Sequence, residues 1–140
     1  MNWYLKVLKE HYADFNGRAR RKEYWMFTLF HIIIIIAIML LSFVLLGGEN
    51  YNNEEPNPFV FIGLGIYILA TFIPSLALSV RRLHDVGKSG WFYLITLIPY
   101  IGGLILFVFA CKDSENGANK WGENPKGIGN NEAINEIGRE

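Results

Sequence analysis

The sequence predicts an all-α integral membrane protein, with three transmembrane helices preceded by an interfacial amphipathic helix. Two observations support this prediction. Of the 140 residues, 51% are hydrophobic, yet the thirteen Lys/Arg and thirteen Asp/Glu residues all lie outside three long apolar runs. Each run is long enough to cross a bilayer, because ~20 helical residues span its hydrocarbon. The core of a soluble protein imposes no such segregation of charge.

Residues 3–15 predict the interfacial helix. At about 100° per residue, their apolar and aromatic side chains gather on one side, while Lys6, Lys9 and Glu10 lie opposite. A helix of this kind lies at the membrane surface with its apolar side in the acyl boundary. We therefore expect it on the cytoplasmic leaflet, ahead of the first span.

The first apolar run, residues 25–46, predicts a transmembrane helix whose bulky Ile and Leu side chains face lipid. His31 lies about 9 Å into this run, at ~1.5 Å per residue. An ionisable residue at such a depth raises a functional hypothesis. Because a neutral imidazole needs few hydrogen bonds to be buried, we favour a structural histidine.

The second apolar run, residues 59–80, predicts a transmembrane helix at the centre of the bundle. Its small residues, among them Ser75 and Ser79, let neighbouring backbones approach closely. Pro74 predicts a kink, because proline lacks the N–H that would bond the carbonyl four residues earlier.

The third run, residues 91–111, admits two interpretations. Its stretch IPYIGG, residues 98–103, either kinks one transmembrane helix or breaks the run into two half-helices. Each half would be too short to span, so a broken run would be re-entrant. The full length of the run favours the kinked transmembrane helix.

The distribution of positive charge predicts the orientation. Residues 1–24 hold six Lys and Arg, the loop 81–90 holds three, and the loop 47–58 holds none but three Glu. By the positive-inside rule, the N-terminus and the loop 81–90 are cytoplasmic. The polar loop 112–126 lies outside if the third run spans, and inside if that run is re-entrant. Residues 127–140 are expected to be a flexible polar tail.

Composition argues against several other classes of protein. A net charge of zero does not suit nucleic acid as a partner. The single cysteine, Cys111, has no partner for a disulfide within the chain. We predict no metal and no cofactor, since His84 and Asp85 alone are fewer than the three or four ligands of a metal site.

Two basic clusters, FNGRARRKEYW (15–25) and RRLHDVGKSGW (81–91), carry the candidate site. Each places basic residues and a glycine beside an aromatic residue at the membrane boundary. At helical spacing, Arg81 shares a face with His84 or Asp85. The candidate binding residues are Arg18, Arg21, Glu23, Arg81, Arg82, His84 and Asp85.

These residues admit three interpretations. The one we favour is a structural clasp, in which Asp85 pairs with an arginine of the first cluster. The second is a site where arginines bind a phosphate or an anionic lipid headgroup. The third is catalysis on a lipid headgroup, with His84 and Asp85 central. An isolated His–Asp pair is no hydrolase signature, so we predict no catalytic residue.

Four stretches also resemble a known family in their order along residues 1–126, which we treat as a single membrane domain. They are MNWYLKVLKEHYADFNGRARRKEYWMF, IPSLALSVRRLHDVGKSGW, LIPYIGG and CKDSENGANKWGENP. The chain resembles the domain of unknown function 805 family, small bacterial inner-membrane proteins of the YhaH/YhaI type. The family's G-x-N-x-Y/F-G-x-N-P motif falls here on Gly117, Asn119, Trp121, Gly122, Asn124 and Pro125. In its S-G-R-x-x-R-x-E-Y/F-W motif, Asn16 replaces the usual Ser.

The resemblance implies an integral protein of the bacterial inner membrane and no established activity. We expect a non-enzymatic, multi-pass module that binds a partner or anionic lipid through its basic cytoplasmic face. A homo-oligomer or a membrane-protein partner would suit so small a bundle. The alternatives are an oligomeric transporter or channel for small solutes, lined by Pro74, Ser75 and Ser79, and a lipid-headgroup enzyme.

Overall fold

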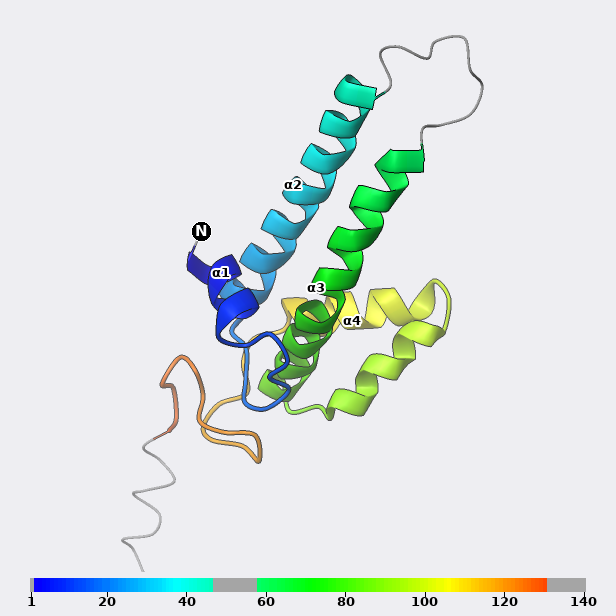
Figure 1. The fold of residues 1–140 in the computed structure, drawn as a ribbon. Coiled ribbons are helices and arrows are strands. Elements are labelled where there is room, and N and C mark those ends of the chain that lie inside the picture. The colour runs from blue at the N-terminus through cyan, green and yellow to red at the C-terminus, as the bar shows by residue number, and fades with distance from the viewer. Residues whose placement is uncertain (1, 47–57, 131–140) are drawn as a thin grey trace, which may run out of the picture.

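The computed structural model describes residues 2–46 and 58–130, which fold into helices and turns. The helices are α1 (Asn2–Lys9), α2 (Arg21–Leu46), α3 (Pro58–Asp85), the 3-10 helix η1 (Gly90–Leu97) and α4 (Ile101–Cys111). α2 and α3 run in opposite directions side by side, and the other helices gather around the end where α2 begins (Figure 1). The prediction of an all-helical chain is confirmed.

α2 and α3 are long and apolar enough to cross a membrane, over Arg21–Val44 and Phe61–Asp85. They contain the first two predicted spans. Large apolar side chains lie open on them, with Phe43 70% and Leu69 76% exposed. Hydrocarbon surroundings tolerate such exposure, whereas water penalises it. The predicted outer loop 47–58 lies, apart from its last residue, outside the described part of the chain.

The third apolar run, residues 91–111, is not one helix, and the predicted kinked span is wrong. η1 ends before Pro99, Tyr100 takes a positive φ of 67°, and α4 then returns toward α2 (Figure 1). Pro99 has no N–H with which to continue η1. The two arms meet at Gly102, where a Cβ would lie 1.9 Å from the carbonyl oxygen of Ile95. The run therefore forms the two short helices of the broken alternative.

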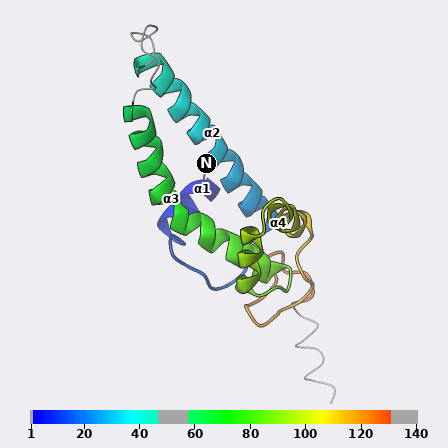
Figure 2. The same ribbon diagram turned by 90° about the vertical axis from the view of Figure 1, so that its right-hand side faces the viewer.

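Pro74 lies inside α3, which changes direction along its length (Figure 2). The carbonyl of Ala70, four residues before the proline, receives no N–H from it. The hydroxyl of Tyr12 donates to this carbonyl at 2.7 Å. A side chain from the N-terminal segment therefore satisfies the backbone group that the proline leaves without a donor.

α1 ends at Lys9, so the predicted helix 3–15 is too long. Beyond it, Asp14 accepts a hydrogen bond from the backbone N–H of Asn16 and pairs with His11 at 2.8 Å. Local bonding of this kind favours a turn over further helix. The N-terminal segment therefore turns back toward α3 instead of extending along the membrane surface.

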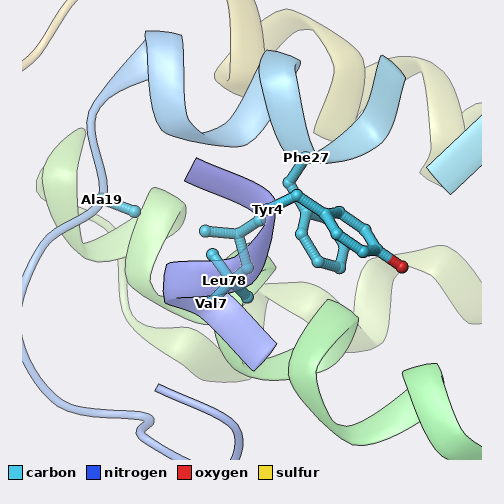
Figure 3. Packing of buried hydrophobic residues seen from close by; sticks show 5 residues of the cluster. All are labelled: Tyr4, Val7, Ala19, Phe27 and Leu78. Carbon is cyan, nitrogen blue, oxygen red and sulfur yellow. The ribbon is translucent and has the colours of Figure 1, made fainter. Parts of the chain in front are cut away.

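The apolar side of α1 packs inside the protein. Tyr4 and Val7 lie in a buried cluster with Ala19, Phe27 and Leu78 (Figure 3). The rings of Tyr4 and Phe27 stack with their centroids 5.0 Å apart. α1 therefore covers the junction of α2 and α3, and only part of its apolar surface remains for a membrane interface.

Two further boundaries differ from the prediction. α3 continues to Asp85, so the predicted loop 81–90 is reduced to the residues between Asp85 and η1. The predicted flexible tail 127–140 begins with a fixed turn, because the N–H of Gly117 donates to the carbonyl of Ile128 at 2.9 Å. Its last ten residues lie outside the described part of the chain.

Candidate functional site

The two basic clusters meet where the start of α2, the end of α3 and the chain after α4 converge (Figure 1). Six of the seven predicted site residues have buried side chains there: Arg18, Glu23, Arg81, Arg82, His84 and Asp85. Arg21 is the exception, because it is exposed. We use the name clasp for Asp85 and the two arginines that bond its carboxylate, Arg18 and Arg82.

Asp85 is the centre of the clasp and is fully buried. Its Oδ1 accepts from Nε of Arg18 at 3.1 Å. Its Oδ2 accepts from Nη1 of Arg82 and from the hydroxyl of Ser114 at 2.6 Å. A carboxylate removed from water needs such partners, since an unpaired buried charge is strongly destabilising. One side chain thereby joins the N-terminal segment, α3 and the chain after α4.

Arg18 donates chiefly to backbone carbonyls. Its Nη1 bonds the carbonyl of Gly117 at 2.8 Å, and its Nη2 bonds those of Glu115 at 2.6 Å and Asp85 at 3.2 Å. Because its N–H groups point at these acceptors, the guanidinium has no fork directed at an external phosphate. Arg18 therefore fixes residues 115–117 over the end of α3.

Arg82 performs the same task on the other side of Asp85. It donates to the carbonyls of Ala19 and Phe109, both at 3.4 Å, and to that of Lys112. These carbonyls include the end of α4, where helical carbonyls lack partners within the helix. Arg82 therefore ties α4 back to α3, which closes the hairpin of the third apolar run.

Arg81 pairs with Glu23 and not with Asp85. The Arg81 Nη2 and Glu23 Oε1 atoms lie 3.4 Å apart between the first turn of α2 and the end of α3. The backbone carbonyl of Arg81 also accepts from the N–H of Ala19 at 3.1 Å. Arg81 and Asp85 lie four residues apart on α3, at the expected helical spacing, but the carboxylate of Asp85 pairs with Arg82, three residues before it.

His84 lies between the N-terminal segment and the tail. Its Nδ1 donates to the carbonyl of Gly17 at 3.2 Å, since a carbonyl can only accept. The imidazole stacks on Trp121, with ring centroids 4.5 Å apart and planes 10° from parallel. Asn119 donates to the carbonyl of His84 at 3.0 Å. The imidazole is thus held in one orientation by Gly17 and Trp121.

Polar residues of the loop 112–126 hold in place the part of the chain that Arg18 contacts. Asn124 donates to the carbonyl of Glu115 at 2.9 Å, and Asn119 donates to the Glu115 carboxylate at 2.9 Å. Gly117 has a φ of 72° and Gly87 a φ of 75°, values that favour glycine. A Cβ on Gly87 would lie 2.7 Å from Glu115 Oε2. The glycine and asparagine residues of the G-x-N-x-Y/F-G-x-N-P motif therefore determine the shape of the loop that Arg18 contacts.

Arg21 lies in a separate open cleft of about 520 Å³, here called the basic cleft. Its lining residues are Arg20, Arg21, Lys22, Trp25, Asp113 and Lys126. Asp113 pairs with Lys126 across it. This hydrogen bond lowers the pKa of Asp113 below its ordinary value of 3.8, so the carboxylate stays ionised at neutral pH. Sequence reasoning put only Arg21 in the site, although the RARRK run pointed to its neighbours.

His31 is satisfied inside the protein, as a structural histidine requires. Its Nδ1 lies 2.9 Å from the hydroxyl of Tyr67, which in turn lies 3.0 Å from the hydroxyl of Tyr4. His31 also stacks between Phe27 and Tyr67. Sequence reasoning missed Tyr67, because nothing in the sequence indicates that α3 faces α2 at this level.

No group of three His, Cys, Asp or Glu side chains suited to a metal occurs in the segments that the structure describes. At the clasp, Asp85 pairs with Arg18 and Arg82. What the arrangement offers chemically is therefore a buried ionic network beside a solvent-open cationic cleft.

Comparison with known proteins places this chain among membrane proteins of one family. The profile described as "Protein of unknown function (DUF805)" matches residues 12–123. Inner membrane protein YhaI of Escherichia coli (strain K12) is 46% identical over 126 residues, or 90% of this chain and 97% of that protein. Inner membrane protein YhaH of the same organism is 46% identical over 126 residues, or 90% and 98%. No solved structure matches the chain.

Proposed function

Because the chain belongs to the DUF805 family and its relatives are inner membrane proteins, we propose that it is a non-enzymatic inner-membrane module that binds anionic lipid headgroups. The binding site is the basic cleft. The clasp is its scaffold and does not contact the lipid. The N-terminus and the cleft face the cytoplasm of a bacterial cell.

The contrast in bonding between the two groups of arginines carries this proposal. Arg18 and Arg82 are buried and bonded to protein oxygens. Among the ion pairs formed by the described residues, none includes Arg20, Arg21 or Lys22. Cations that are exposed and not paired within the protein are the ones available to an external phosphate.

The position of the basic cleft fits a headgroup. It lies at the first turn of α2, where the apolar span begins, and Trp25 lines it. Tryptophan is enriched at this depth of a membrane. Each Lys or Arg near an anionic surface contributes about 1 kcal/mol of attraction. Four cations against the single carboxylate of Asp113 leave the cleft strongly positive.

The distribution of charge supports the orientation. Twelve of the thirteen Lys and Arg residues lie in the described segments, and all twelve flank the clasped end of the molecule. None lies in α2 after its first turn, and those of α3 are Arg81 and Arg82, near its C-terminal end. Because α4 returns to the clasp, the residues after it share a side with the N-terminus. The positive-inside rule makes that side cytoplasmic.

The clasp supports the cleft by setting the path of the chain after α4. Arg82 bonds the carbonyl of Lys112, and Ser114 bonds Asp85, so Asp113 is held between two anchored neighbours. This brings Asp113 and its partner Lys126 to the start of α2. Buried Asp85 therefore positions the chain after α4, which favours a scaffold over a reaction centre.

Quenching of Trp25 by brominated lipids tests the proposal. The protein carries Phe at Trp3, Trp91 and Trp121, and is reconstituted with brominated phosphatidylglycerol or brominated phosphatidylcholine. We expect a clear preference for phosphatidylglycerol around Trp25. Equal quenching by the two lipids would overturn the proposal.

Paired variants localise the effect. Arg21→Gln with Lys22→Gln removes two charges from the cleft, and we expect the preference to fall about tenfold or more. Lys6→Gln with Lys9→Gln removes the same charge from α1, and we expect less than about a twofold change because neither lines the cleft. Equal losses in the two variants would mean that net charge, and not the cleft, attracts the lipid.

A further inference from the structure

A second cavity lies on the other side of the clasp, between α3, η1 and the tail. It is open, has a volume of about 570 Å³, and shares no lining residue with the basic cleft. Its size falls within the range of sites that enclose small molecules. Four aromatic side chains line it: Phe15, Trp91, Tyr93 and Trp121.

His84 supplies an imidazole to this cavity, which Ser89 also lines. Its Nδ1 carries a proton, since it donates to the carbonyl of Gly17. In the neutral imidazole the other nitrogen, Nε2, is then a bare acceptor. Nε2 lies beside Gly90, which also lines the cavity, at 3.4 Å from the position of a Cβ there. No hydrogen bond to Nε2 occurs among the described residues.

The cavity is reached from the apolar surface of η1. Trp91 is 80% exposed, and Leu94, which also lines the cavity, is half exposed. η1 belongs to the third apolar run, most of whose exposed side chains are large and apolar. A ligand dissolved in the bilayer can therefore enter without passing through the basic cleft.

We propose that this cavity binds a membrane-soluble hydroquinone. One ring hydroxyl donates to Nε2 of His84, and the ring lies among the aromatic side chains, which favour stacking with another ring. The apolar chain of the ligand leaves along η1 into the bilayer. The proposal concerns binding alone, with no redox step, and is independent of lipid binding at the basic cleft.

The hydroxyl donor is the feature to test. Full-length protein in phosphatidylcholine nanodiscs is titrated, without oxygen, with a hydroquinone carrying a ten-carbon chain. The same molecule with both hydroxyls methylated is the matched probe. We expect the hydroquinone to bind about five- to tenfold more tightly, as one hydrogen bond allows, and the ¹⁵N signal of His84 Nε2 to move upfield. Equal affinity of the two probes would overturn the proposal.

Variants of the protein separate the polar and apolar contributions. His84→Phe keeps a ring to stack on Trp121 but removes the acceptor, so the two probes should bind alike. Leu94→Trp fills the cavity at an exposed position and should abolish binding of both probes, with the clasp untouched. Arg21→Gln should change neither affinity. If His84→Phe fails to fold, the comparison of the two probes on the unmodified protein still tests whether the ligand donates a hydrogen bond.

A neutral lipid is the rival occupant. Dioctanoylglycerol also offers a hydroxyl donor but has no ring. Tighter binding of dioctanoylglycerol than of the hydroquinone, with the same dependence on His84, would overturn the proposal in favour of a lipid site.

Discussion

Two regions of the molecule differ in the kinds of side chain that they bury and expose: the end that holds the clasp, and the far halves of α2 and α3. At the clasp, Arg82 and Asp85 are among the most deeply buried side chains of the described residues. Along the far halves of the helices, leucines and phenylalanines are open. A water-soluble protein arranges these residue types the other way. The inversion indicates that hydrocarbon surrounds the far halves, while directional polar bonds hold the clasped end together.

The largest effect is expected where a buried charge loses its partner. Asp85→Ala leaves Arg18 and Arg82 buried without their carboxylate, which costs about 3–5 kcal/mol. Unfolding of the purified protein in detergent, followed by far-UV circular dichroism, measures this loss. Asp113→Asn is the matched control, because it removes an exposed carboxylate. An Asp85→Ala variant as stable as the control would contradict the role of the clasp.

A second pair of variants compares a buried leucine with a lipid-facing one on the same helix. Leu78→Ala opens a cavity in the core cluster and should cost about 2–5 kcal/mol. Leu69→Ala acts on an open side chain and should cost less than about 1 kcal/mol, because hydrocarbon replaces hydrocarbon. The same unfolding assay serves both. A large loss for Leu69→Ala would mean that another subunit covers this part of α3.

The Tyr12–Ala70 bond lies at the boundary between the two regions. Tyr12→Phe removes one hydrogen bond and should cost about 1 kcal/mol. In a Pro74→Ala background, the new N–H at residue 74 bonds Ala70, so Tyr12→Phe should then cost almost nothing. A double-mutant cycle measures this coupling. Additive losses would show that Tyr12 acts elsewhere.

The smallest effect is expected at the rim of the basic cleft. Asp113→Asn releases Lys126 and should raise the preference for phosphatidylglycerol by about twofold to fivefold. The hydrogen bond with Lys126 lowers the pKa of Asp113. The carboxylate therefore stays ionised at pH values where an ordinary aspartate begins to protonate. Lipid preference should therefore stay constant between pH 7 and about pH 5. A steep rise within that interval would contradict the assignment.

Sequence reasoning succeeded where one local property decides the structure. Charge segregation identified two long helices, and the kink and its orphan carbonyl followed from Pro74 alone. It predicted that Asp85 would meet an arginine of the first cluster, and the structure joins it to Arg18. The prediction for the third apolar run was wrong because the composition of this run is compatible both with a kinked span and with a hairpin. The close contact of Gly102 with Ile95 decides between them, and this contact is tertiary.

The details of the site also depend on contacts distant in sequence. Arg82 was expected as one of the arginines of an anion site, but besides Asp85 it bonds the carbonyls of Phe109, near the end of α4, and Lys112, just after it. Lys126 joins the cleft only because the clasp returns the chain to α2. Trp121 was expected as the aromatic residue of the motif in the loop 112–126, and the structure stacks it on His84. Residue types and spacing carry no signal for such pairings.

The central claim is that the chain after α4 returns to the side of the membrane where the N-terminus lies. Labelling one residue before the hairpin of η1 and α4 and one residue after it tests this claim most directly. Lys88→Cys and Ala118→Cys are introduced separately into a protein with Cys111 replaced by Ser, and membrane vesicles of known orientation are treated with an impermeant maleimide. We predict that both positions react from the cytoplasmic side, because the hairpin of η1 and α4 does not cross the bilayer. Reaction of residue 118 from the side opposite to residue 88 would contradict it.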